Sequence, residues 1–149
     1  MRFDLNGRVA VVTGGALGIG AGIAKVLAAN GASVVIGDTD QAAARKTVEA
    51  IAADAGKAES FALDVTSWTS AFSFVEQVER QVGPIDILVN NAGVSRRVPL
   101  LEMDEAEWDR VLAVNLKGQF VMTRAVLPGM TARNYGRIVN MSSVCGKQG

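Results

Sequence analysis

Three short segments of the sequence carry residue types that could bind a ligand or do chemistry. Thr13–Gly20 (TGGALGIG) is rich in glycine, Asn90–Gly93 (NNAG) combines amide and small side chains, and Ser142 and Ser143 are adjacent hydroxyls. A glycine-rich turn that opens a helix presents free backbone N–H groups to a phosphate. The sequence has no histidine, which excludes a Ser-His-Asp triad, a Cys-His pair and a His-ligated metal. These segments therefore favour nucleotide binding over acyl transfer.

The single cysteine, Cys145, excludes an intrachain disulfide framework and a zinc site built from several cysteines. No metal is therefore expected. Charge at Arg2 interrupts the N-terminus, so this segment is not predicted to be a signal peptide. A free thiol without a secretion signal is typical of a reducing compartment, which predicts a cytoplasmic protein.

The composition indicates an ordinary globular domain. The sequence has 149 residues, of which 49% are hydrophobic, and 15 basic residues balance 15 acidic ones. This length suits one domain with a single core. The absence of a basic excess argues against nucleic acid and membrane surfaces as partners, and no apolar run has the length of a membrane helix.

The residues that could do chemistry must be positioned by strands and helices, and five short apolar runs predict the strands. They cover Val9–Thr13, Ser33–Gly37, Glu59–Leu63, Ile85–Val89 and Arg137–Met141. Most are apolar on both faces, as in a parallel sheet that lies between two layers of helices. Helical periodicity falls between them, over Ile19–Ala29, Gln41–Ala55, Ser67–Val82 and from Glu105 onward. This alternation predicts an α/β fold, a Rossmann-type doubly wound parallel sheet with strand order 3-2-1-4-5.

The apolar stripes of the predicted helices are expected to face the core. Their members are Ile19, Ile23, Val26 and Leu27, then Trp68, Phe72, Val75, Val78 and Val82, and finally Trp108, Val111, Leu112 and Leu116. Asp104 and Glu107 predict a capping box at the start of the last helix.

Three glycines of the first segment have separate expected roles. Gly14 allows the tight turn off the strand, Gly18 lets the backbone approach a pyrophosphate, and Gly20 allows close packing of the helix. The alternative is an ordinary tight turn. The position between a strand and a helix favours nucleotide binding.

Asp38, at the end of the second predicted strand, bears on the choice of cofactor. A carboxylate there can accept hydrogen bonds from the ribose hydroxyls of NAD and repels the 2′-phosphate of NADP. The loop positions Gly15, Ala16 and Leu17 offer no basic side chain for that phosphate. The alternative is that Asp38 only caps the next helix, although Thr39 or Asp40 could do so instead. We therefore predict NAD in preference to NADP.

The glycine spacing, T-G-x-x-x-G-x-G, together with N-N-A-G, resembles that of the short-chain dehydrogenase/reductases over essentially the whole chain. The resemblance implies that Asp64 and Val65 contact the adenine, that Asn115 is the catalytic asparagine, and that Ser143 binds the substrate carbonyl. For Asp64 a plain strand-end turn is the alternative, and for Asn115 a solvated side chain. The predicted cofactor-binding residues are Gly14, Gly18, Ile19, Gly20, Asp38, Asp64, Val65, Asn90, Ala92 and Gly93.

The family's general acid is a tyrosine followed by a lysine in the pattern Tyr-x-x-x-Lys, and this pair is absent. The only tyrosine, Tyr135, has Val139 at the lysine position. The family places its tyrosine further beyond Ser143 than Gly149. Residues 1–149 are therefore expected to be the dinucleotide-binding part of a longer single-domain enzyme, inactive alone.

The predicted function is hydride transfer between NAD(H) and an alcohol or ketone, in an enzyme that forms a homo-oligomer. The alternative is a non-catalytic or truncated NAD-binding module that needs a partner chain or a further segment. Arg96 and Arg97 could meet a substrate carboxylate, although such a pair is more often solvated. The sequence does not identify the alcohol or ketone.

Overall fold

The computed structural model describes residues 4–96 and 98–143. Five parallel strands form one sheet in the order β3-β2-β1-β4-β5, which confirms the predicted fold class and strand order. The strands are β1 (Val9–Thr13), β2 (Ser33–Asp38), β3 (Lys57–Ala62), β4 (Ile85–Asn90) and β5 (Arg137–Asn140). Arg97, Cys145 and residues 146–149, which carry some of the expectations above, lie outside the described residues.

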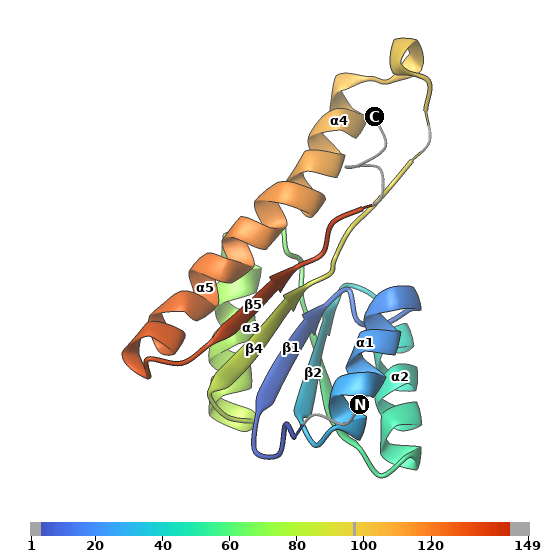
Figure 1. Cartoon of the computed structure of the whole chain (residues 1–149). Coiled ribbons are helices and arrows are strands. Elements are labelled where there is room, and N and C mark those ends of the chain that lie inside the picture. Colours follow the sequence, from blue (N-terminus) through green and yellow to red (C-terminus); the bar gives the residue numbers. More distant parts are fainter. Residues whose placement is uncertain (1–3, 97, 144–149) are drawn as a thin grey trace.

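Two layers of helices cover the sheet (Figure 1). One layer is α1 (Gly18–Ala29) and α2 (Gln41–Ala53), and the other is α3 (Trp68–Gln81) and α5 (Gly118–Ala132). Side chains alternate along β1, so Val11 joins the core beneath α3 and α5 while Ala10 and Val12 join the core beneath α1 and α2. Because both faces are covered, every residue of β1 is buried.

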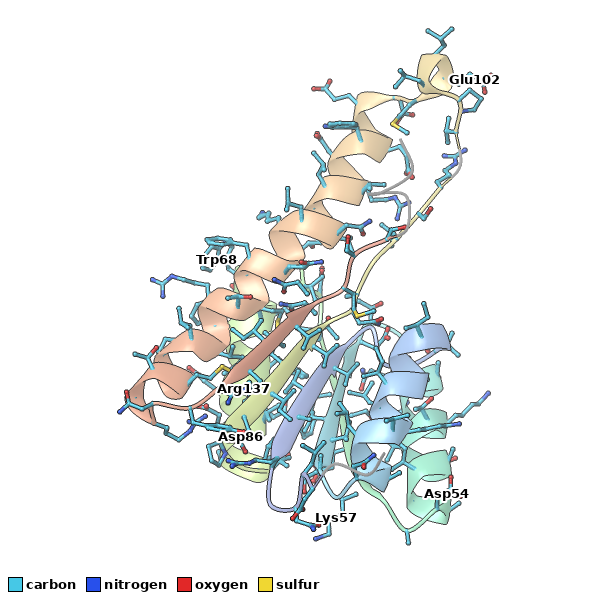
Figure 2. The ribbon with its side chains drawn as sticks, in the orientation of Figure 1. Asp54, Lys57, Trp68, Asp86, Glu102 and Arg137 are labelled. Atoms are coloured by element: carbon cyan, nitrogen blue, oxygen red, sulfur yellow. The ribbon has the colours of Figure 1, made fainter. Side chains whose placement is uncertain are left out.

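Helix α4 (Glu105–Leu112) continues into α5 through a π-helical turn, Ala113–Lys117. Figure 1 shows α4 and α5 as one long rod whose α4 end extends past the carboxyl ends of the strands. In Figure 2, Glu102 marks that end of the molecule, and Asp54 and Lys57 mark the opposite end. Asp104 caps α4 by accepting a hydrogen bond from the Glu107 N–H at 2.8 Å, so this half of the predicted capping box is confirmed. The Glu107 side chain binds Arg110 instead of closing the box.

The prediction that every apolar helix stripe faces the core holds only in part for α1, where Ile23 and Leu27 pack against the core. Ile19 and Val26 are 70% and 61% exposed, and the buried residues of this helix are Gly20, Ala24 and Ala28. Small side chains let α1 approach the sheet closely, and Ile19 and Val26 lie on the outer side of the helix. Helix α2 also ends two residues earlier than predicted, since Ala55 takes a left-handed conformation with φ of 60°.

The stripes on the other side of the sheet are only partly buried. Val75 and Val78 of α3 are in the core, as predicted. Trp68, Phe72, Trp108, Leu112 and Leu116 are instead exposed, and Figure 2 shows Trp68 projecting outward beside α5. On this side of the sheet, helical periodicity identified the apolar face of each helix but could not tell whether another part of this chain covers it.

Candidate functional site

A hollow of about 530 Å³ opens at the carboxyl ends of β1, β2 and β4. Parallel α/β sheets bind ligands at this edge, where the strand order reverses. Nine of the residues predicted to bind the cofactor line it: Gly14, Gly18, Ile19, Gly20, Asp38, Asp64, Val65, Ala92 and Gly93. The hollow therefore gathers segments that are far apart in the sequence.

The conformation of the glycine loop requires glycine at two positions, because a side chain would not fit there. Gly14 has a φ of 63°, and a Cβ there would lie 2.8 Å from the Cα of Ala92. A Cβ at Gly20 would overlap the Gly14 carbonyl oxygen and lie 2.5 Å from the Asn91 Nδ2. The roles expected for these two glycines are confirmed in part. The close approach of Gly20, however, is to the loop and the N-N-A-G turn, and not to the sheet alone.

Asn91, which the sequence did not single out, joins the two loops. Its Nδ2 donates to the carbonyl oxygens of Thr13 and Gly14, both at 3.0 Å. In return, the Thr13 hydroxyl accepts hydrogen bonds from the backbone N–H groups of Asn91 and Ala92, both at 3.0 Å. These contacts cross from β1 to the segment after β4, so only the sheet order could have revealed them. A side chain with both a donor and an acceptor, placed after a strand beside β1, was the available signal.

Asp38 faces the glycine loop from the end of β2. Its Oδ2 accepts a hydrogen bond from the Ala16 N–H at 3.1 Å, and its Oδ1 accepts one from the Asp40 N–H at 3.0 Å. Asp40 caps α2, because its Oδ1 accepts from the Ala43 N–H at 2.9 Å. Asp40, and not Asp38, therefore caps α2. The Asp38 carboxylate instead brings a negative charge to the wall of the hollow.

Asp64 and Val65 close the hollow on the β3 side. The Asp64 Oδ1 accepts from both the N–H and the hydroxyl of Thr66, at 2.9 and 2.7 Å, so this carboxylate shapes a turn and also lines the hollow. Val65 is 7% exposed, and a Cβ at Gly118 would come within 2.7 Å of its Cγ2. The first residue of α5 therefore packs closely against this wall.

Asn90 does not line the hollow. It is 1% exposed, and its Nδ2 points to the other side, toward Asn140 Oδ1 at 2.8 Å and Thr123 Oγ1 at 3.2 Å. Among the described residues, no donor reaches the buried Asn90 Oδ1. The two asparagines of the N-N-A-G turn thus face opposite ways, because successive side chains along an extended chain alternate.

Asn115 lies in the π-helical turn and clamps the segment that follows the hollow. Its Oδ1 accepts from the Val94 N–H and its Nδ2 donates to the Val94 carbonyl oxygen, both at 2.8 Å. Val94 lines the hollow, so Asn115 stands at its border. The solvated alternative for this side chain is wrong. Both the oxygen and the nitrogen of its side-chain amide make hydrogen bonds to the protein backbone, outside the helix.

Ser142 and Ser143 follow β5 and are exposed. The Met141 N–H donates to the Asn90 carbonyl oxygen at 2.9 Å, and Gln119 Nε2 donates to the Met141 carbonyl oxygen at 3.1 Å. The serines thus emerge from the same edge of the sheet as the N-N-A-G turn.

A charged cluster lies on α4, beyond this edge. Arg110 donates from Nε and Nη2 to the two Glu107 carboxylate oxygens, each at 2.8 Å. These hydrogen bonds, above all, hold the pKa of Glu107 below its ordinary value, and the charges of Arg110 and Arg96 add to the effect. Arg96 is therefore near an acidic side chain and is exposed.

Two searches of the residues that the structure describes bear on other classes of site. No group of three or more His, Cys, Asp or Glu side chains is arranged to hold a metal ion. No helix in the described ranges combines the length and the hydropathy that a membrane span requires.

Comparison with known proteins gives consistent matches. The family described as short chain dehydrogenase matches residues 8–149. Acetoacetyl-CoA reductase of Allochromatium vinosum is 43% identical over 95% of this chain and 58% of its own length. D-threitol dehydrogenase of Mycolicibacterium smegmatis is 42% identical over 95% of this chain and 54% of its own length.

A solved structure agrees with these sequence matches. A metagenomic short-chain oxidoreductase in complex with NADP superposes with a TM-score of 0.90 and is 44% identical, over 96% of this chain and 65% of that one. The chain thus spans less than two thirds of the length of each of these three proteins.

Proposed function

The chain belongs to the short-chain dehydrogenase family, and from that premise we propose that it forms the dinucleotide-binding part of an oxidoreductase. The proposed reaction is hydride transfer between NAD(H) and an alcohol or ketone. The observation that carries this proposal is that the glycine loop, Asp38 and the N-N-A-G turn all line the same hollow. A dinucleotide site needs a phosphate-binding helix start beside a ribose-binding carboxylate, and both are present.

The preference for NAD over NADP rests on Asp38. Its carboxylate already accepts the Ala16 N–H, so a loop donor that could serve a phosphate is occupied by a negative group. A 2′-phosphate in this position would meet like charge, whereas ribose hydroxyls could donate to the carboxylate. The related metagenomic enzyme is described as a complex with NADP, so related chains do not all share one preference.

The chemistry above the sheet is assigned to residues at its carboxyl edge. A bound dihydronicotinamide supplies the hydride that reaches the substrate carbonyl carbon. Ser143 donates a hydrogen bond to the carbonyl oxygen and orients it, and Asn115 fixes the Val94 segment beside it. The proton for the oxygen comes from a general acid outside residues 1–149, since Tyr135 lies at the opposite end of β5. A non-catalytic NAD-binding module remains the alternative function.

The deciding experiment is a fluorescence titration of the intact protein with NADH and with NADPH. We expect NADH to bind at least about tenfold more tightly, because a 2′-phosphate would face Asp38. A panel of small ketones and hydroxy compounds then tests for turnover. Tighter binding of NADPH would overturn the Asp38 argument. Tight NADH binding without turnover on any carbonyl would favour the non-catalytic module.

We further propose that the additional length of the relatives corresponds to a segment that covers β5. Val139 is 47% exposed on this edge strand, and an uncovered apolar edge of a parallel sheet is a liability. We therefore place residues 1–149 as the nucleotide-binding part of a single domain in which a further segment covers β5. The single cysteine and the absence of histidine are compatible with a cytoplasmic enzyme whose general acid is a tyrosine.

The intact enzyme is further proposed to be a homo-oligomer that associates through one apolar face. We call this surface the α4–α5 face; it consists of Leu112, Leu116 and Phe120, with Trp68 and Phe72 beside them. Asp109 and Lys117 flank Leu112 and Leu116 along the rod. If two copies pack antiparallel about a twofold axis, Asp109 of each copy meets Lys117 of the other. The face is thus complementary to itself.

A further inference from the structure

The hydrogen-bond ladder between β4 and β5 ends at Met141. The Met141 N–H donates to the Asn90 carbonyl oxygen at 2.9 Å. In a parallel ladder, the next bond would run from the Ala92 N–H to the Met141 carbonyl oxygen. The Ala92 N–H donates to the Thr13 hydroxyl instead, at 3.0 Å. The loop contacts that shape the hollow therefore remove the strand partner of the Met141 carbonyl.

The side chain of Gln119 takes the place of that partner. Its Nε2 donates to the Met141 carbonyl oxygen at 3.1 Å. Gln119 is half-buried at the start of α5, and its main-chain carbonyl oxygen accepts from Asn90 Nδ2 at 3.4 Å. A glutamine at a helix surface is usually solvated, whereas this one completes a sheet edge that backbone groups have left incomplete.

The same helix holds both segments that flank the proposed reaction site. Asn115, in the π-helical turn, clamps Val94 after β4, and Gln119, one turn further on, holds Met141 after β5. Residues four apart on a helix lie on one face, so a single rigid element sets the spacing between the two segments. The chain leaves the sheet directly after Met141, and Ser142 and Ser143 follow.

We propose that Gln119 is a positioning residue that fixes the last peptide of β5 and thereby aims Ser143 at the substrate carbonyl. This inference rests on the proposed function, which assigns the carbonyl contact to Ser143. Without the Gln119 amide, the Met141 carbonyl has no partner in the ladder, and the peptide plane before Ser142 is free to rotate. A hydroxyl displaced by about 1 Å is enough to slow a reaction that depends on orientation.

The test uses the intact protein and compares the removal of the donor with its replacement. Gln119→Met keeps the length of the side chain without a donor, and Gln119→Glu is a second loss-of-donor variant in case the first does not fold. Gln119→Lys restores a donor. Thr123→Val is the matched control, since Thr123 lies one turn further on and accepts from Asn90, whereas the hydrogen bond to the Met141 carbonyl comes from Gln119. Hydrogen exchange of the peptide that covers Met141–Ser143 reports on the strand end without requiring activity.

We expect faster exchange at Met141–Ser143 in Gln119→Met and Gln119→Glu, and near-parental exchange in Gln119→Lys and Thr123→Val. In the enzyme, kcat should fall about 10- to 100-fold in the loss-of-donor variants, with an unchanged KM for NADH and with partial recovery in Gln119→Lys. The proposal is overturned if exchange is unchanged in the loss-of-donor variants, or if kcat falls equally in Thr123→Val. A joint change of kcat and the KM for NADH in the loss-of-donor variants would also overturn it. A parent protein without dehydrogenase activity overturns the proposed function, while the exchange measurement still decides the role of Gln119.

Discussion

Gly20 and Gly22 stand in the same turn of α1, yet a methyl group at each position would meet different surroundings. At Gly20 it would overlap the Gly14 carbonyl oxygen and press on Asn91, and at Gly22 it would meet nothing within 4 Å. We predict that Gly20→Ala weakens NADH binding by at least about tenfold, because the glycine loop and the N-N-A-G turn must move apart. Isothermal titration calorimetry with NADH would measure this loss.

Gly22→Ala is the matched control for this prediction. The same methyl group in an open helical position should leave NADH binding unchanged and raise the stability by up to about 1 kcal/mol, because alanine is the better helix former. Thermal unfolding of both variants separates the two effects. Equal behaviour of the two variants would mean that close packing at Gly20 does not shape the site.

The charge of Asp38 gives a second prediction at this scale. Asp38→Ser should lower NADH affinity and raise NADPH affinity, shifting the ratio of the two dissociation constants by about 100-fold toward NADPH. Asp40→Ser removes a carboxylate from the same wall and keeps a residue that can cap α2. Its shift should be much smaller. A ratio that moves equally in both variants would assign the preference to the general field of the hollow instead of to a ribose contact.

At the scale of elements, the strands were predictable because most of them consist of consecutive apolar residues, as buried strands do. The run Val9–Thr13 is apolar on both faces, and the structure gives β1 the same bounds. The start of the run Glu59–Leu63 was placed two residues late, because β3 contains several polar residues and begins at an exposed lysine, Lys57. Periodicity alone did not predict the π-helical turn at Ala113–Lys117, in which Asn115 contacts Val94. Such contacts leave no local periodicity.

The ion pair on α4 predicts a pH dependence of stability. Hydrogen bonds from Arg110 lower the pKa of Glu107 in the folded state, so the unfolded state binds the proton more readily. The stabilisation is therefore fully present above the ordinary glutamate pKa of about 4.3 and is lost as the pH falls through the lower, folded value. Glu107→Gln should destabilise the protein at pH 7 and reduce its sensitivity to acid below about pH 4.5. Urea unfolding from pH 3 to pH 7 measures both effects.

Glu105→Gln is the control for that experiment. Glu105 lies in the first turn of the same helix and is exposed, without an ion pair among the described residues. Its neutralisation should change the acid dependence little, apart from a small loss of its favourable interaction with the helix start. Parallel pH profiles for Glu107→Gln and the parent would contradict the assignment of Arg110 as the cause.

For the whole molecule, the site could be predicted where the sheet topology alone decides which residues meet. Asp38 ends a strand, and Asp64 and Ala92 each come shortly after one. Because the carboxyl ends of parallel strands share one edge, their convergence follows from the strand order. The partners of Asn90 and Asn91 could not be read from the motif, because they lie on other strands, in a loop and on a helix far away in the sequence. Gln119 was likewise invisible, since its role depends on a ladder bond that the Thr13 hydroxyl has diverted.

The α4–α5 face gives the last prediction, which concerns assembly. Leu116 is 67% exposed and central to this face, and each of two copies in a twofold pair would bury it. Burying a leucine is worth about 1.5–3 kcal/mol, so losing two of them weakens a dimer by at least about 100-fold in Kd. Leu116→Glu in the intact protein should therefore give smaller particles in light scattering after size-exclusion chromatography. Val26→Glu, at a position 61% exposed on α1, is the control and should leave the particle size unchanged.

Charge reversal distinguishes a second copy from a further segment of the same chain as the partner of this face. Lys117→Asp should weaken the dimer, because it places like charges opposite each other twice, and Asp109→Lys in the same chain should restore the association. Rescue by the double variant requires an antiparallel copy, since within one chain Asp109 and Lys117 are fixed on the same helix face. If Leu116→Glu instead lowers the melting temperature and leaves the particle size unchanged, a segment of the same chain covers the face.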